Sequence, residues 1–171
     1  MNTADVAARR TLGRLRTVLY LVALGLFAGT VAELLMAEHY GDRIQVIPFG
    51  LCALGVVAII VAWWRSQPVV VLATRLILTV IAAGSLFGVY EHVAGNLDFA
   101  REVRPHAGTE EVVKAVLTGG APLLAPGILA VGALVGIAAT IAAQHAGMRR
   151  AASDEGTMAT AGAYPGRQPS P

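Results

Sequence analysis

The chain has 171 residues, of which 56% are hydrophobic and 14% charged, and its formal net charge is +2. A soluble domain is about 45–50% apolar and about 25% charged, so this composition argues against a soluble fold and indicates lipid as the solvent. The single cysteine, Cys52, excludes an intramolecular disulfide and a cysteine-based metal motif. The basic residues form no dense patch, which argues against nucleic-acid binding.

Four apolar runs are each long enough to cross a bilayer, which takes about 20 helical residues. They cover residues 17–37, 44–64, 69–92 and 121–143. In lipid, only helices and closed barrels satisfy every backbone hydrogen bond, and these runs are too long and too uniformly apolar for barrel strands. The sequence therefore predicts an all-α membrane protein with a four-helix transmembrane bundle over residues 17–145.

The basic residues indicate the orientation, because cytoplasmic flanks carry an excess of Arg and Lys. Nine of the thirteen lie in the basic segment 1–16, around the loop after the second run, or in the segment 146–171. We therefore expect both termini in the cytoplasm. The small, Arg-, Ala- and Gly-rich chain suggests a bacterial plasma membrane. Cleavage of the first run as a signal peptide is the alternative, although its apolar core exceeds the usual length of about 7–15 residues.

The connections differ in length and composition. A short loop joins the first two runs into a hairpin, whereas the outer segment 95–120 is long. A helix start is indicated at Thr109, which would cap a first turn rich in glutamate. We expect a short helix on the outer membrane surface, with a loosely ordered loop as the alternative. The tail 146–171 is rich in small and polar residues and is predicted to be disordered. The apolar face of the outer helix would consist of Val112, Val113, Val116 and Leu117.

Glycines spaced four apart share a helix face and allow close helix packing in membranes. The pattern also suggests a tandem repeat of a helical hairpin, because aligning Arg16 with Arg75 superposes two of the three glycine pairs. Whether the glycine faces pack within one chain, in a homo-oligomer or against a membrane partner protein is left open. The pairs are Gly25 with Gly29, Gly84 with Gly88, and Gly132 with Gly136.

Ionisable residues follow two of these glycine pairs. Glu33 lies four residues after Gly29, and Glu91 and His92 lie three and four after Gly88. Counting about 1.5 Å per residue from Arg16 and Arg75, both glutamates lie about 24–26 Å from the inner boundary of a hydrocarbon layer about 30 Å thick. Intramembrane ionisable residues are functional candidates. The sequence therefore predicts a shared site of Glu33, Glu91 and His92.

The outer side is predicted to be acidic and rich in histidine, which would concentrate cations. Carboxylate and imidazole also suit divalent metals, so a metal is one interpretation, although no cofactor is firmly implied. The first hypothesis is a protein that binds or conducts a cation or proton. The alternative is a structural or accessory subunit whose glycine faces pack against partners. No catalytic motif is found, so an enzyme is not expected. For the predicted site of Glu33, Glu91 and His92, the weaker additional candidates are Glu38, His39 and His106.

Overall fold

The computed structural model of the chain describes residues 3–38, 40–41, 44–119 and 126–141. This part of the chain forms helices joined by loops and contains no strand. The elements in chain order are α1 (Thr3–Met36), the 3₁₀ turn η1 (Ile44–Val46), α2 (Ile47–Trp64), α3 (Pro68–Val103) and α4 (Thr109–Leu117). A further helix, the 126–141 helix, covers Pro126–Ile141.

Three helical segments are long and apolar enough to cross a membrane: α1, Ile44–Trp64 and α3. This finding confirms the prediction of an all-helical chain with membrane-spanning segments. The 126–141 helix is apolar but shorter, so the predicted fourth span over 121–143 is not confirmed. The predicted tail over 146–171 and His39 lie outside the described residues.

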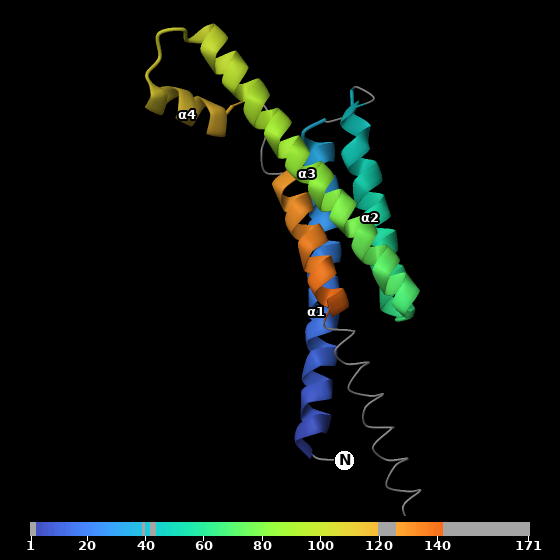
Figure 1. The fold of residues 1–171 in the computed structure, drawn as a ribbon. Coiled ribbons are helices and arrows are strands. Elements are labelled where there is room, and N and C mark those ends of the chain that lie inside the picture. The colour runs from blue at the N-terminus through green and yellow to red at the C-terminus, as the bar shows by residue number, and fades with distance from the viewer. Residues whose placement is uncertain (1–2, 39, 42–43, 120–125, 142–171) are drawn as a thin grey trace, which may run out of the picture.

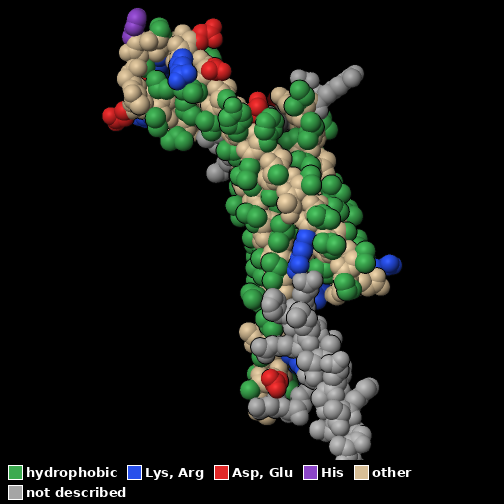
Figure 2. All heavy atoms as spheres, viewed as in Figure 1, with side chains coloured by type: hydrophobic (Ala, Val, Ile, Leu, Met, Phe, Trp, Pro, Cys, Tyr) green, Lys and Arg blue, Asp and Glu red, His purple; other side chains and the backbone are tan. Residues whose placement is uncertain are grey.

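The long helices and the 126–141 helix lie side by side, with α1 extending beyond the bundle at one end and α3 at the other (Figure 1). Hydrophobic side chains cover most of the middle of the visible face, and acidic side chains lie toward its two ends (Figure 2). On α1 the buried residues recur every three or four positions, which places them on one face. The side chains buried in the core include Tyr20, Phe27, Ile59, Leu78 and Ile81.

Helix α3 is longer than the sequence predicts. The predicted span ends at residue 92, whereas α3 continues to Val103, 36 residues or about 54 Å in all. The polar residues after Tyr90 suggested a helix end, but Asn96 and Ala100 are buried, and α4 packs against α3. Glu91 and His92 therefore lie within a helix and not at its end.

The structure has a short helix in the predicted segment, α4, and with the end of α3 it forms a helical hairpin. Its N-cap residue is Gly108, so Thr109 is the first helical residue and not the predicted cap. The buried amide of Asn96 donates a hydrogen bond of 3.0 Å to the Val116 carbonyl. Gly119 is needed beside it, because a Cβ there would lie 2.6 Å from the Asn96 side chain.

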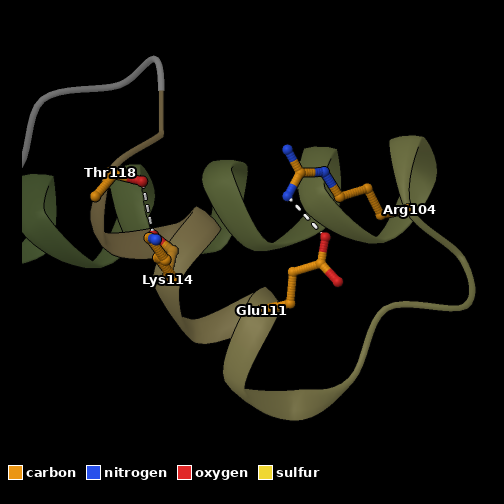
Figure 3. Close-up of polar contacts among 4 residues, drawn as sticks. All are labelled: Arg104, Glu111, Lys114 and Thr118. Atoms are coloured by element: carbon orange, nitrogen blue, oxygen red, sulfur yellow. Dashed lines mark hydrogen bonds and ion pairs between the residues drawn. The ribbon is translucent and has the colours of Figure 1, made fainter.

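A second link in the hairpin is the ion pair between Arg104 and Glu111, at 3.0 Å (Figure 3). Both side chains are more than half exposed, so this pair contributes only about 0–1 kcal/mol. At the end of α4 the Thr118 hydroxyl donates to the Lys114 carbonyl at 2.8 Å. The buried Asn96 contact is therefore the stronger polar link between α3 and α4.

The glycine pairs have different environments. A Cβ at Gly132 would lie 3.3 Å from Leu26, and one at Gly136 would lie 2.8 Å from Leu78, so this pair packs closely within the chain. A Cβ at Gly25 or Gly29 would meet nothing within 4 Å. Close packing inside the described part of the chain is therefore found for Gly132 and Gly136 but not for Gly25 and Gly29.

The tightest glycine contact in the core was not predicted. A Cβ at Gly55 would lie 2.6 Å from the ring of Phe27, which is completely buried. The burial pattern also does not support the tandem repeat. In the proposed alignment Phe27 corresponds to Leu86, which is 62% exposed.

We expect Gly55→Ala to lower the thermal stability of the protein in detergent micelles, because the new methyl group would overlap the Phe27 ring. Overpacking of this kind costs about 1–3 kcal/mol. Gly25→Ala is the matched control: it has open space and should be neutral or stabilising by up to about 1 kcal/mol through helix propensity. Equal melting temperatures for the two variants would contradict the packing described for α1 and α2.

We also expect Asn96→Ala to loosen the α3–α4 hairpin, because the Val116 carbonyl loses its buried donor at a cost of about 1–3 kcal/mol. Hydrogen exchange of α4 backbone amides should rise while exchange in α1 stays constant. Arg104→Ala, which removes the exposed ion pair, should change the same rates little. If Arg104→Ala had the larger effect, the ion pair and not the buried amide would hold α4.

Candidate functional site

A cavity of about 380 Å³ opens where the outer ends of the helices diverge. The outer end is the end of the bundle at which α1 stops and α2 begins. All four helices of the bundle contribute to its walls. The lining residues are Thr30, Glu33, Leu34, Ala37, Ile44, Gln45, Ile47, Pro48, Leu51, Gly84, Ser85, Phe87, Gly88, Glu91, His92, Pro126 and Leu129.

Small residues on α3 leave room for this cavity. A Cβ at Gly84 would lie 3.9 Å from Leu51 of α2, and one at Gly88 would lie 3.5 Å from Pro126. These are ordinary contact distances and not the close approach that the G-x-x-x-G pattern predicts. Gly84 and Gly88 therefore shape a cavity wall instead of forming a tight helix contact.

The three principal candidates of the predicted site all line this cavity. Glu33 comes from the last turns of α1, and Glu91 and His92 come from α3, far away in the sequence. Glu33 and His92 are half-buried, and Glu91 is exposed. Among the described residues, two carboxyl groups and an imidazole are thus the ionisable groups on the cavity wall.

The weaker candidates do not join them. Glu38 follows α1 in a turn, with a φ of 51°, and is exposed away from the cavity wall. His106 is exposed in the turn between α3 and α4. His39 lies outside the described residues. The site that the structure assembles is therefore smaller than the predicted set.

The divalent-metal interpretation finds no support in the structure. Among the residues that the structure describes, no group of three or more His, Cys, Asp or Glu side chains is arranged to hold a metal ion. Glu33, Glu91 and His92 share a cavity but do not form a ligand set of that size. The arrangement suits a ligand large enough to reach several walls.

Sequence reasoning missed the neutral polar residues of the cavity. The Thr30 hydroxyl donates to the Leu26 carbonyl at 2.9 Å, and the Ser85 hydroxyl donates to the Ile81 carbonyl at 2.7 Å. Each donates its proton within its own helix, four residues back, as hydroxyls in apolar surroundings commonly do. Gln45 accepts a hydrogen bond of 3.0 Å from the Gly41 amide and so orders the turn before α2.

The cavity is closed on its inner side. About one helical turn further in, each helix contributes a buried residue to a packed layer. This layer, the central layer, consists of Phe27, Gly55, Ile81 and Ala133. Among the described residues, the inner side of the cavity is therefore bounded by buried, packed side chains.

Comparison of the chain with known protein families, with curated proteins and with solved structures gives no match. The functional argument therefore depends on the geometry of the cavity itself. That geometry combines apolar walls, two carboxyl groups and one imidazole at the outer end of a helical bundle.

Proposed function

We propose that the protein is a multi-pass membrane protein that binds a cationic ligand in the outer cavity. The observation that carries this proposal is the convergence of Glu33, Glu91 and His92 on one cavity of about 380 Å³. Small-molecule sites are cavities of about 300–1,000 Å³, mostly apolar, with a few polar groups that set orientation. Carboxyl groups on such a wall favour a ligand of positive charge.

The chemistry of the walls favours an organic cation over a bare ion. Most lining side chains are apolar, including Leu51, Phe87 and Leu129. The wall hydroxyls of Thr30 and Ser85 donate to their own helices. An amine with an apolar body would contact the carboxyl groups with its charge and the remaining walls with its body. The central layer consists of buried residues beneath the cavity, and we therefore favour binding of the ligand over its conduction through the bundle.

For topology we infer four spans with both termini in the cytoplasm of a bacterial plasma membrane, as the basic residues indicate. This orientation puts the cavity and α4 on the outer side. Half of the apolar face of α4 is exposed, and this exposed half supports a position of α4 on the membrane surface. Val112 and Val116 are partly buried, whereas Val113 is 52% and Leu117 is 65% exposed. Figure 1 shows α4 lying across the direction of α1 at the outer end.

A specific observation also favours the accessory-subunit alternative. Gly25 and Gly29 lie on a face of α1 with nothing within 4 Å of their Cβ positions. No described helix of the chain packs against this G-x-x-x-G pair, so the pair is a candidate contact for a helix of another chain. Cysteine crosslinking at Ala28→Cys in a Cys52→Ala background would test it, since Ala28 is exposed between the two glycines.

The ligand proposal is tested by calorimetric titration of the purified protein in nanodiscs with benzyltrimethylammonium. We expect saturable binding, weakened about tenfold or more, or about 1.4 kcal/mol, in a protein carrying both Glu33→Gln and Glu91→Gln. Both substitutions keep the side-chain size and remove the charge. Leu51→Trp should also weaken binding, because the larger side chain would occupy the cavity.

The matched control for this titration is Glu38→Gln. It removes an exposed carboxyl group on the same side of the bundle that does not line the cavity. Affinity should stay within about twofold of the native value, because the Glu38 carboxyl group is exposed and does not line the cavity. Equal affinities in the native protein and the double variant would contradict the proposal, and so would an equal loss in Glu38→Gln.

A further inference from the structure

A cluster of polar side chains lies on the other side of the central layer, toward the end of the bundle where α2 stops and α3 begins. We call this end the inner end. The cluster combines side chains from all four helices of the bundle. Its members are Arg16, Tyr20, Trp63, Arg75 and Thr140.

Arg16 stabilises the end of α2. Its Nη2 donates a hydrogen bond of 3.0 Å to the carbonyl of Trp63, in the last turn of that helix. Carbonyls there lack a partner within the helix, and the helix dipole favours a positive charge beside them. The Arg16 guanidinium also lies 5.5 Å from the centre of the Tyr20 ring, and Tyr20 stacks on Trp63 at 5.8 Å. Arg16 therefore has a structural role.

The hydrogen-bond donors of Arg75 are less completely satisfied than those of Arg16. It lies seven residues after Pro68, about 10 Å along α3. Its Nε donates to the Thr140 hydroxyl at 2.8 Å. Its Nη2 is buried and makes no hydrogen bond among the described residues. The Nε donor is thus held by the 126–141 helix, whereas the neighbouring Nη2 is unsatisfied among the described residues.

The hydroxyl of Tyr20 is the second unsatisfied group. Tyr20 is completely buried, and its hydroxyl also has no well-aligned hydrogen-bond partner among the described residues. The Arg16 guanidinium lies 5.5 Å from the centre of the Tyr20 ring, so a positive charge lies beside this side chain. An unmade hydrogen bond of a buried polar group costs about 1–3 kcal/mol.

The cluster has positive charge and no acidic partner in the part of the chain that the structure describes. The ion pair found there is Arg104 with Glu111, at the opposite end of the molecule. Asp5, the described acid nearest in sequence to Arg16, precedes it by eleven residues, about 16 Å of helix. Charges inside a membrane bundle are costly unless they are paired. The described residues therefore leave this cluster with uncompensated positive charge, which favours an anion beside it.

We propose that Arg75 and the Tyr20 hydroxyl bind a phosphate group, next to the positive charge of Arg16. The planar fork of a guanidinium matches two phosphate oxygens, and a hydroxyl can donate to a third. Basic sites between helices at the cytoplasmic boundary bind lipid headgroups. Trp64, 82% exposed at this end, is an interfacial anchor of the same boundary. The phosphate comes from a phospholipid of the adjacent leaflet or from free phosphate.

The test measures melting temperatures of the purified protein in detergent, with phosphatidylglycerol or with sodium phosphate added at constant ionic strength. We expect either source to raise the melting temperature of the native protein. Stabilisation by phosphatidylglycerol alone assigns a lipid headgroup, and stabilisation by inorganic phosphate as well assigns a site for the phosphate group itself. No stabilisation by either would overturn the proposal.

Tyr20→Phe is the most informative variant, because it removes only a hydroxyl that makes no well-aligned hydrogen bond among the described residues. Without added phosphate its stability should equal or exceed that of the native protein, as expected when a buried unpaired polar group is removed. With phosphate its stabilisation should fall at least about threefold, since one donor to the phosphate is lost. Full stabilisation of Tyr20→Phe would exclude this hydroxyl from the site and overturn the proposal as stated.

Arg75→Gln should abolish the stabilisation by phosphate, and Arg75→Lys should restore part of it through charge without the planar fork. Arg14→Gln is the control, because Arg14 is exposed on α1 at the same end and makes no contact in the cluster. Loss of stabilisation in Arg14→Gln equal to that in Arg75→Gln would indicate general electrostatic attraction and overturn a defined site.

Discussion

The contact between the Phe27 ring and Gly55 sets the arrangement of the rest of the bundle. The glycine lets the aromatic ring lie directly against the backbone of α2, which fixes how α1 and α2 pack at this level. Gly136 permits a similar approach of the 126–141 helix to Leu78 and Ile59. In lipid no hydrophobic effect draws helices together, so such close packing is the main stabilising contribution. The outer cavity opens where this packing ends.

The central layer also separates two polar sites of opposite charge. Glu33, Glu91 and His92 line the outer cavity, whereas Arg16 and Arg75 lie toward the inner end. Because the central layer lies between them, the carboxyl groups of the cavity cannot pair directly with the two arginines. Among the described residues the two sites do not neutralise each other, and the two proposals, an organic cation and a phosphate group, follow from this separation of charge.

The sequence predicts the helical class, the outer helix α4 and the placement of Glu33 with Glu91 and His92, because helical spacing fixes which residues share a face and a depth. It does not predict which face lies inside. In a membrane helix the core and the lipid-facing surface are both apolar, so hydropathy cannot distinguish the open Gly25 from the packed Gly136. The buried Asn96 and the unsatisfied Arg75 depend on contacts between distant helices, which spacing along the chain does not contain.

The central claim is that the bundle is closed at the central layer and open only at the outer end. Adjacent positions on α2 test it directly, because Leu51 lines the cavity and Cys52 is 1% exposed in the core. The measurement is the rate at which a membrane-impermeant, cationic methanethiosulfonate modifies each thiol from the outer side of sealed vesicles. Leu51→Cys in a Cys52→Ala background should react at least about tenfold faster than native Cys52, because thiol modification requires access, and benzyltrimethylammonium should protect it. Equal rates at the two positions, or no protection, would contradict the account.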